Sequence, residues 1–459
     1  MTQTTLVTDT ADTLAPLGLG RNSAVLIVGL GKTGFSIARF LAAQGLRFAI
    51  TDTRAAPPYL GEFRETFPDA AVFMGGFQAA AFEAATHLIV SPGVSLQEPL
   101  IRSAVLRGLR VLGDLDLFAC MARAPVLAIT GANGKSTVTT LVGLMAEANG
   151  TRARVGGNLG TPMLDLLDEG AQIYVLELSS FQLESSHLLE PLAATVLNIS
   201  PDHMDRYEGL DDYAQAKQRI FNGQGLMVLN RDDPRVAAMA TVGREVVWFS
   251  LDDPSADYGV RRMEGDEWVT CQGQPLLKTS EIKLRGRHNL ANVLASLALA
   301  DRAGFSREAC LRALRSFAGL EHRAQWVGDF AGINWINDSK ATNVGACIAA
   351  LNGMEKPVIL IAGGDGKGAD FRVLRDAVAR KVKALVLMGR DAGLIEQAVG
   401  DLVKTVRVNA MRQAVEAAKG LAQAGDVVLL APACASLDQF KDYQERGRVF
   451  AEEAGRMAE

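Results

Sequence analysis

The sequence of 459 residues predicts an α/β protein of three domains, each built on a mostly parallel sheet covered by helices. Three observations support this prediction. Short apolar runs alternate with helical patterns along the chain. A glycine-containing loop follows a predicted strand in each third of the chain, and the chain is too long for one hydrophobic core. We expect the domains to be 1–113, 114–319 and 320–459.

The first domain begins with a Rossmann-like fingerprint. A strand over 24–28 runs into Gly29-Leu-Gly31-Lys-Thr-Gly34, and a helix and a strand over 47–51 follow, ending at Asp52. Further strands are predicted at 87–91, before Pro92-Gly93, and at 110–112. The segment is therefore expected to bind a nucleotide, although about one hundred residues is small for a full dinucleotide domain.

The second domain carries a phosphate loop. The strand 126–130 leads into Gly131-Ala-Asn-Gly134 and then Lys135-Ser136-Thr137, before a helix predicted over 138–149. Such a loop presents backbone N–H groups to a polyphosphate, while the lysine neutralises the outer phosphates and a hydroxyl holds Mg²⁺. Two residues separate the glycines, where the general pattern has four. We interpret this loop as an ATP site of the P-loop ATPase type.

The remainder of the second domain is also α/β. Apolar strands are predicted over 173–178 and 194–199, as in a parallel sheet covered on both faces. The stretch 245–285 is interpreted as antiparallel and irregular. A helix over 288–300 closes the domain, with Asn289 and Asn292 together and away from its apolar face.

The third domain is predicted to be Rossmann-like. Its strands are expected over 333–337, 357–362, 384–388 and 427–431. Ligands of open α/β sheets gather at the carboxyl ends of the strands. The loops there are Gly363-Gly-Asp-Gly-Lys-Gly368, Gly389-Arg-Asp and Pro432-Ala-Cys-Ala-Ser-Leu-Asp438.

Three side chains of the second domain are candidates for metal chemistry. Glu177 ends a buried strand, as the acidic Mg²⁺ partner of a phosphate loop does, or it is a carboxylate in solvent. His203, between Asp202 and Asp205, is a ligand or a packing and capping residue. Lys217 shares an apolar helical stripe, so it extends its amine to the surface or presents a neutral amine that can add CO₂ beside a metal.

The third domain adds charged candidates. Asp338-Ser-Lys340-Ala-Thr342 follows a predicted strand, and His322-Arg323 stands at the domain junction, where the pair could also simply solvate the linker. Lys367 lies among glycines, which leave room for an anion to reach its ammonium group.

Composition limits the partners. Lysine and arginine number 47 against 52 acidic residues, for a net charge of −5, so no general attraction to nucleic acid or anionic lipid is expected. The five cysteines lack metal-type spacing, as in a reducing compartment. The N-terminus has no signal pattern, and no apolar run approaches a membrane span. We expect a cytoplasmic monomer.

Together these motifs resemble the Mur ligases, the ATP-dependent amide-forming enzymes of peptidoglycan precursor synthesis. The resemblance covers residues 24–450 and depends on the order of its motifs. They are Gly29–Gly34, Ser91–Gly93, Thr130–Thr137, Gly157-Asn158, Glu177–Glu184, Asp202–Asp205, His322-Arg323, Asn337–Asn343, Gly363–Lys367 and Ala433–Phe440. The last three favour the member that adds glutamate.

The resemblance implies a reaction and its ligands. D-glutamate is joined to UDP-N-acetylmuramoyl-L-alanine through an acyl phosphate and a tetrahedral intermediate, with release of ADP and phosphate, in cell-wall synthesis. ATP is a co-substrate and two Mg²⁺ ions are expected. The chemistry is coherent, because a carboxylate must be activated before an amine can attack it, and closure of three domains excludes water.

The resemblance also implies the site residues. The UDP substrate is expected at Gly31, Lys32, Thr33, Asp52, Thr53, Ser91, Pro92, Gly93 and Asn158. ATP is expected at Gly131, Asn133, Gly134, Lys135, Ser136, Thr137, Asn289, Asn292, Arg323, Asp338 and Lys340. Glutamate is expected at Thr342, Lys367, Ser436 and Leu437. The metal ligands are expected to be Ser136, Glu177, His203 and carbamylated Lys217, and the catalytic residues Lys135, His203 and Lys217.

Three rival functions remain open on sequence. An NAD(P)-dependent dehydrogenase explains residues 29–52 but not the phosphate loop or the third domain. A folylpolyglutamate synthetase shares a similar phosphate loop and adds glutamate, but would lack the fingerprint domain ahead of it. A non-catalytic nucleotide-binding regulator would release no phosphate with any acceptor.

Overall fold

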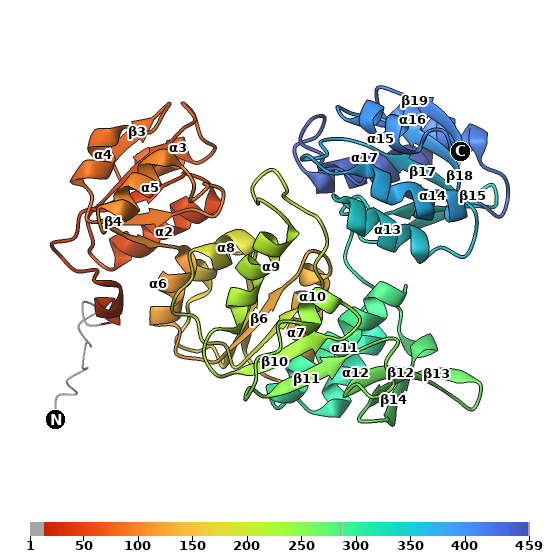
Figure 1. Cartoon of the computed structure of the whole chain (residues 1–459), viewed down its shortest axis with the longest axis horizontal. Coiled ribbons are helices and arrows are strands. Elements are labelled where there is room, and N and C mark those ends of the chain that lie inside the picture. The colour runs from red at the N-terminus through yellow and green to blue at the C-terminus, as the bar shows by residue number, and fades with distance from the viewer. Residues whose placement is uncertain (1–12, 285, 458–459) are drawn as a thin grey trace.

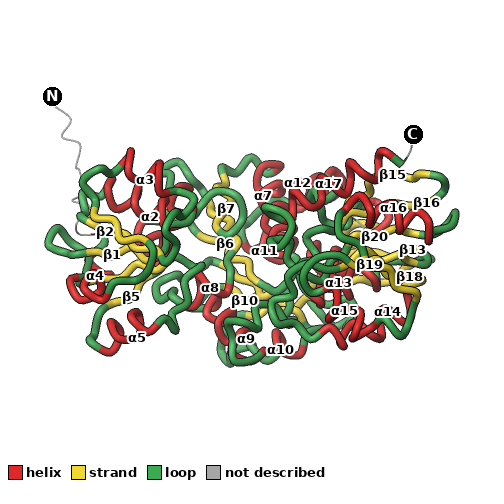
Figure 2. The backbone as a smooth tube through the Cα atoms, turned by 90° about the horizontal axis from the view of Figure 1, so that it is seen from above, coloured by secondary structure: helices red, strands yellow, loops and turns green. Residues whose placement is uncertain are grey.

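The computed structural model describes residues 13–284 and 286–457, which form three sheets in succession along the chain (Figure 1). Figure 2 shows them in a row, with the central domain between the other two. The α/β fold of three mostly parallel sheets is therefore confirmed. None of the helices in these described ranges is long and apolar enough to cross a membrane.

The N-terminal sheet has five parallel strands in the order β3-β2-β1-β4-β5. The strands are β1 (Val25–Val28), β2 (Phe48–Asp52), β3 (Ala71–Met74), β4 (His87–Val90) and β5 (Arg110–Leu112). The helical elements are η1 (Ala15–Leu17), α2 (Lys32–Ala43), α3 (Leu60–Thr66), α4 (Ala79–Ala84) and α5 (Pro99–Leu106). The strand order reverses between β1 and β4, so the loops after these two strands frame a ligand crevice.

The central sheet has nine strands in the order β14-β13-β12-β11-β10-β9-β6-β8-β7. Its strands are β6 (Val126–Thr130), β7 (Ala153–Gly157), β8 (Ile173–Glu177), β9 (Ala193–Val196), β10 (Leu226–Asn230), β11 (Val246–Phe249), β12 (Tyr258–Met263), β13 (Asp266–Cys271) and β14 (Gln274–Lys278). Every residue of β6 and of β8 is buried, which explains their continuous apolar sequences.

Helices surround this sheet. They are α6 (Asp114–Met121), α7 (Lys135–Ala148), η2 (Met163–Leu166), α8 (Ser180–Glu184), α9 (Leu210–Gln218), η3 (Arg219–Phe221), α10 (Pro234–Ala237), η4 (Thr279–Glu281), α11 (Arg287–Arg302) and α12 (Arg307–Ser316). A capping box fixes the start of α8, because Ser179 and Gln182 satisfy each other's backbone N–H groups.

Two local predictions for the central domain need correction. The stretch 245–285 is antiparallel only across β12, β13 and β14, since β11 pairs in parallel with β10 and β12 meets β11 in parallel. Helix α7 begins at Lys135 rather than at 138, because the phosphate loop itself forms its N-terminus.

The C-terminal sheet has six strands in the order β15-β16-β20-β17-β18-β19, with only β15 antiparallel. The strands are β15 (Gln325–Phe330), β16 (Ile333–Asn337), β17 (Val358–Ala362), β18 (Val382–Leu387), β19 (Lys404–Arg407) and β20 (Val427–Leu430). The helical elements are α13 (Val344–Asn352), η5 (Phe371–Leu374), α14 (Arg375–Lys381), α15 (Ala392–Val399), α16 (Met411–Leu421) and α17 (Tyr443–Arg456).

The cores connect the domains unequally. One apolar cluster runs without a break from Ile27 and Phe63 of the N-terminal domain to Tyr174 and Leu176 of the central sheet. The C-terminal domain has two clusters of its own, one on each face of its sheet. Its attachment to the central domain therefore depends more on polar contacts, which lie around the site described next.

Candidate active site

The phosphate loop is a tight turn between β6 and α7. Gly134 has φ +87°, and a Cβ there would lie 2.3 Å from Asn292 Oδ1, so only glycine fits beside α11. The Asn133 N–H donates to Asn198 Oδ1 (2.9 Å). Lys135 Nζ donates to the Gly131 and Ala132 carbonyls at 2.8 and 2.9 Å, which holds the ammonium over the loop. Burial lowers the pKa of Lys135, against the attraction of Glu177.

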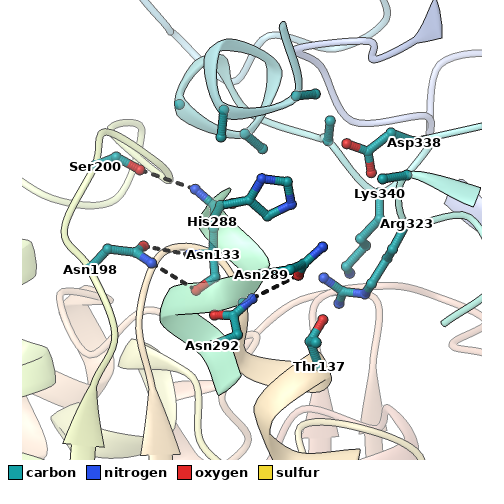
Figure 3. Close-up of a pocket in the computed structure, with 17 residues that line it drawn as sticks. Asn133, Thr137, Asn198, Ser200, His288, Asn289, Asn292, Arg323, Asp338 and Lys340 are labelled. Atoms are coloured by element: carbon teal, nitrogen blue, oxygen red, sulfur yellow. Dashed lines mark hydrogen bonds between the residues drawn. The ribbon is translucent and has the colours of Figure 1, made fainter. Parts of the chain in front are cut away.

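A cavity of about 300 Å³ opens at this loop and is shared by two domains (Figure 3). The central domain contributes mainly amide and hydroxyl side chains, while the C-terminal domain contributes three charged residues among alanines and a glycine. Figure 3 shows Arg323 and Lys340 approaching Asn289 and Thr137 from the opposite wall. The predicted ATP residues lining it are Asn133, Gly134, Thr137, Asn289, Asn292, Arg323, Asp338 and Lys340. The predicted ATP residues that do not line it are Gly131, Lys135 and Ser136, and the Gly131 carbonyl accepts from Lys135 Nζ.

Two asparagines of α11 are buried and polar, although the sequence pattern left them off the apolar face. Asn292 Nδ2 donates to Asn289 Oδ1 (3.0 Å), and both residues are at most 6% exposed. They lie in a cavity wall rather than at the surface, because the N-terminal end of α11 packs against the phosphate loop.

Burial shifts the pKa values of two charged residues that the C-terminal domain contributes to this cavity. Desolvation raises the pKa of Asp338 to about 6 and lowers the pKa of Lys340 to about 8. The Lys340 ammonium lies 4.0 Å from the centroid of the Tyr443 ring. Arg323 donates to Ser136 Oγ (2.7 Å), which connects the C-terminal segment to the first turn of α7.

A second cavity, of about 290 Å³, adjoins the first and brings the metal-type candidates together. It is lined by Lys135, Ser136, Glu177, His203 and Lys217, which were predicted to act jointly. Within residues 13–284 and 286–457, no group of three or more histidines, cysteines, aspartates or glutamates could hold a metal. A cation here would therefore take few protein ligands and complete its shell with phosphate oxygens and water.

The Glu177 carboxylate is buried with only one of its two oxygens hydrogen-bonded among the described residues. Its residue is 3% exposed at the end of β8, and Oε1 accepts from Asn158 Nδ2 at 2.7 Å. Its Oε2 is buried and has no hydrogen-bond partner in the described part of the chain. A buried carboxylate oxygen without a donor is costly, so this atom fits a bound cation.

Lys217 is buried on α9 rather than extended to solvent. The residue is 1% exposed, and Nζ lies 3.4 Å from Thr130 Oγ1 and 4.5 Å from the centroid of the Tyr213 ring. Desolvation, assisted by the charge of Lys135, holds the pKa of Lys217 well below its usual value. The alternative that Lys217 extends its amine to the surface is therefore wrong. The amine faces the cavity, and its burial there favours the neutral form.

His203 occupies a left-handed turn at φ +57° and packs against Phe181, with 4.8 Å between ring centroids. Desolvation lowers the pKa of His203 to about 4, so the ring is neutral and able to act as a ligand. Asp202 faces the cavity, whereas Asp205 is exposed. Burial raises the pKa of Asp202, but the charge and hydrogen bond of Lys367 oppose this, and the pKa of Asp202 stays below the usual value.

The glutamate candidates divide into two groups. Thr342 and Lys367 line the second cavity, and the neighbouring Asn343 donates to Asp202 Oδ2 at 3.0 Å. Ser436 is buried and Leu437 is 71% exposed, and neither lines either of these two cavities. Their loop nevertheless meets the glycine loop of Lys367, because Ala435 and Asp365 form an isolated bridge.

A third cavity, of about 570 Å³, lies at the switch point of the N-terminal sheet. All nine residues predicted for the UDP substrate line it: Gly31, Lys32, Thr33, Asp52, Thr53, Ser91, Pro92, Gly93 and Asn158. Lys32 Nζ donates to the Gly160 carbonyl at 2.6 Å, so the fingerprint loop contacts the central domain. A Cβ on Gly34 would lie 2.0 Å from the Gly29 carbonyl, which explains the last glycine of the fingerprint.

Sequence reasoning missed two arginines, one that lines the third cavity and one that joins two loops of the C-terminal domain. Arg54 lines the third cavity and pairs with both carboxylate oxygens of Asp52, at 2.9 and 2.7 Å. Its position two residues after the acid could have indicated it. Arg446, buried in α17, donates to Ser339 Oγ, the Ser339 carbonyl and the Cys434 carbonyl. It joins the loops after β16 and β20, and no local pattern reveals a contact over such separations.

Domain-family models match each third of the chain. A model described as "Mur ligase MurD-like, N-terminal domain" matches residues 23–113, "Mur ligase middle domain" matches 129–300, and "Mur ligase, glutamate ligase domain" matches 322–434.

Similar proteins span nearly the full length. The UDP-N-acetylmuramoylalanine–D-glutamate ligase of Methylococcus capsulatus is 61% identical over 436 residues, covering 95% of each chain. That of Pseudomonas putida is 50% identical over 438 residues, covering 94% of this chain and 97% of its own. Among solved structures, the UDP-N-acetylmuramate–alanine ligase MurC of Thermotoga maritima has a TM-score of 0.59 at 19% identity, covering 95% and 100% of the two chains. MurF of Acinetobacter baumannii has a TM-score of 0.59 at 18% identity, covering 94% and 90%.

Proposed function

This chain belongs to the Mur ligase family, and we propose that it is the ATP-dependent ligase that joins D-glutamate to UDP-N-acetylmuramoyl-L-alanine. The reaction would release ADP and phosphate and supply peptidoglycan synthesis. Relatives that carry this name at 50–61% identity over nearly the whole chain support the choice of substrate.

One structural observation carries the proposal: the second cavity adjoins the other two. It shares Asn133, Gly134, Arg323 and Lys340 with the cavity at the phosphate loop, and it shares Asn158 with the cavity of the N-terminal domain. A nucleotide triphosphate in one and a uridine nucleotide in the other would bring their reactive ends together there. Such convergence is what transfer of a phosphoryl group to a carboxylate requires.

We propose that ATP first converts the acceptor carboxylate into an acyl phosphate. The carboxylate oxygen bonds to the γ-phosphorus as the bond to ADP breaks. Lys135, Arg323 and Lys340 would then offset the negative charge of the transferring group. The hydrogen bond from Asn158 would fix the Glu177 carboxylate, and the bond between Asn292 and Asn289 would fix the amide side chains of the opposite wall.

The second step would be attack by the amine of glutamate on the acyl carbon. A tetrahedral intermediate forms, the amine loses a proton, and phosphate leaves with its bonding electrons. Lys367 and Thr342 line the cavity where this amine must arrive, and Lys367 would pair with a glutamate carboxylate. Ser436 and Leu437 remain proposed contacts through their loop.

We propose that Mg²⁺ binds in the second cavity, held by Ser136, Glu177, His203 and a carbamate on Lys217. The orphaned Glu177 Oε2, the neutral His203 ring and the buried Lys217 amine support this donor set. Bound Mg²⁺ would neutralise phosphate charge. The carbamate forms when the neutral amine adds CO₂ and releases one proton, and its negative charge is the reason to expect a second ion.

The proposed division of labour follows the domain boundaries expected from the sequence. Residues 1–113 would bind the UDP substrate, 114–319 would bind ATP, and 320–459 would bind the amino acid. We further propose a monomer acting in the cytoplasm, where ATP is available.

Phosphate release in the presence of UDP-N-acetylmuramoyl-L-alanine and ATP tests the proposal, with D- and L-glutamate compared. Release with the D form alone supports it. Release with neither form contradicts it, and release with folate and glutamate instead would favour the folylpolyglutamate synthetase reading. Fluorescence titration with NADH is the control for the dehydrogenase reading.

A further inference from the structure

Arg206 crosses from the central domain to the loop that follows β4 of the N-terminal domain. Its Nη1 donates to the Pro92 carbonyl at 2.7 Å, and its Nη2 donates to the Val94 carbonyl at 3.2 Å. The loop 91–94 lines the third cavity, where we expect the UDP substrate. One guanidinium therefore holds two carbonyls of a substrate-binding loop in another domain.

The same guanidinium is fixed on its own side. Nη2 also donates to Glu184 Oε2 at 2.8 Å, and the side chains of this pair are only 13% and 18% exposed. The other oxygen of Glu184 accepts from the Tyr207 hydroxyl. The pair is thus neutral overall, and the guanidinium makes three hydrogen bonds, which makes a nearly buried arginine tolerable.

Phe181 connects this contact to the catalytic cavity. The Arg206 Cζ lies 3.9 Å from the centroid of the Phe181 ring, and that ring lies 4.8 Å from the ring of His203. The Arg206 N–H donates to the His203 carbonyl at 2.9 Å, so a single turn presents both side chains. His203 faces one cavity while Arg206 holds the edge of another.

The loop bound by Arg206 is also tied to the fingerprint. Ser91 Oγ donates to the Gly29 carbonyl at 2.8 Å, and the Ser91 N–H donates to the Val28 carbonyl at 2.9 Å. A continuous chain of contacts therefore runs from the fingerprint loop through residues 91–94, Arg206 and Phe181 to His203.

We propose that Arg206 is a positioning residue that fixes the UDP-substrate loop relative to His203. This inference rests on the proposed function, because the acceptor carboxylate must reach the second cavity while its uridine end stays in the third. Arginine suits the role, since its planar fork reaches two carbonyls and a carboxylate while its face stacks on an aromatic ring. Lysine could satisfy only part of this arrangement.

Steady-state kinetics of Arg206→Met and Arg206→Lys test the inference. We expect Arg206→Met to raise the KM for UDP-N-acetylmuramoyl-L-alanine about 10- to 100-fold, because charged hydrogen bonds across the domains are lost. The KM for ATP should stay within about twofold, and Arg206→Lys should recover part of the loss. An unchanged KM for the UDP substrate in folded Arg206→Met would overturn the proposal.

Arg219→Met is the matched control. Arg219 bonds to the main-chain carbonyl of the same Glu184 but remains within the central domain. It should leave all three KM values near those of the wild type. If both variants change every KM and the melting temperature alike, Arg206 is merely structural and the proposal fails.

Hydrogen exchange separates this inference from the proposed function. Peptides that cover residues 91–98 should exchange faster in Arg206→Met than in the wild type or Arg219→Met, whatever reaction the enzyme catalyses. Equal exchange in all three proteins would contradict the role of Arg206 even if the ligase activity is present. If Arg206→Met exchanges faster but the wild type releases no phosphate, the role of Arg206 in holding the loop is supported and the proposed function is contradicted.

Discussion

Lys367 Nζ lies 2.5 Å from Asp202 Oδ1, and this ion pair joins the C-terminal domain to the turn that carries His203. The two side chains are 18% and 11% exposed, so the pair is well shielded from solvent. Lys367 is also the cation proposed for the glutamate carboxylate. A bound glutamate would therefore share Lys367 with Asp202 or displace it, which couples amino-acid binding to the contact between the domains.

Replacing Lys367 with methionine should raise the KM for D-glutamate about 100-fold, because a charged partner of the carboxylate is lost. The KM for ATP should change far less. Steady-state kinetics with each substrate varied in turn would measure both. Lys383→Met is the control, since Lys383 forms a comparable 2.7 Å ion pair with Asp426 in the same domain. A glutamate KM equal to that of the wild type would refute the role given to Lys367.

Lys217→Ala should reduce kcat by more than about 100-fold, because the proposed carbamate can no longer form on a buried amine. Added bicarbonate or short carboxylates should restore part of the activity. Lys217→Arg keeps a cation but cannot add CO₂ in the same way, so it should be inactive and should not respond to these additives. Indifference of a folded Lys217→Ala enzyme to rescue would argue against carbamylation.

The affinity for ATP should fall as the pH rises through about 8. Burial lowers the pKa of Lys340 to about 8, so above this pH the free enzyme offers a neutral amine to the phosphates. Because ATP binds the protonated form, it should bind about tenfold more weakly at pH 9 than at pH 7 and should take up a proton. Calorimetry with a non-hydrolysable ATP analogue in two buffers measures both effects. Lys340→Arg should remove the pH dependence, and its persistence there would assign it to another group.

Two glycines of the fingerprint should separate folding from binding. Gly34→Ala places a Cβ 2.0 Å from the Gly29 carbonyl, so it should lower the melting temperature and the yield of folded protein. Gly31→Ala meets no atom within 4 Å, so the fold should survive. Because Gly31 lines the third cavity, the added methyl group should raise the KM for the UDP substrate about tenfold. Equal stability of the two variants would contradict this assignment.

Asp114→Asn should stabilise the protein at alkaline pH. Burial raises the pKa of Asp114 to about 6, and its Oδ1 has no hydrogen-bond partner among the described residues. Since the folded pKa exceeds the unfolded one, the cost of ionisation is absent below about pH 4 and complete above pH 6, where it reaches about 3 kcal/mol. The amide of the introduced asparagine would not find all its hydrogen-bond partners, and this offsets part of the gain in stability. The melting temperature should therefore rise by about 2–6 °C at pH 8 and hardly at pH 4.

Asp116→Asn is the natural comparison on the same helix. Asp116 is also buried, but it accepts hydrogen bonds from the N–H groups of His187 and Leu188 and contacts the His187 ring. Its replacement should lower the melting temperature at pH 8. Parallel shifts in both variants would show that the two carboxylates are not distinguished by their partners.

The sequence predicted the features that are encoded locally. The fingerprint and the phosphate loop each depend on glycines and on one strand and one helix, so their predicted residues meet in the expected cavities. Strands β6 and β8 were visible because burial on both faces leaves continuous apolar runs. Short strands with mixed patterns, such as β3, β7 and β19, were not predicted, since pairing and not composition stabilises them.

Tertiary placement accounts for most of the remainder. Arg206 and Arg446 donate hydrogen bonds to residues more than one hundred positions away in the sequence. No pattern in the sequence around either arginine indicates those partners. The orientation of the loop after β20 depends on its bridge to Asp365, which explains why Ser436 and Leu437 could be assigned to a motif but not to a cavity. The pairing of β11 with β10 was likewise hidden, because a short apolar strand does not specify its direction.

The cavity at the phosphate loop, where we propose that ATP binds, has amide side chains on one wall and Arg323, Asp338 and Lys340 among small residues on the other, and the two walls belong to different domains. A bulky compound anchored to Asn289 and Asn292 alone would act as a wedge, since it would keep Arg323 and Lys340 from closing on the triphosphate. Inhibitors of that kind would not inhibit the many ATPases whose nucleotide pocket lies within one rigid body. Selectivity would then come from the joint between the domains and not from recognition of adenine.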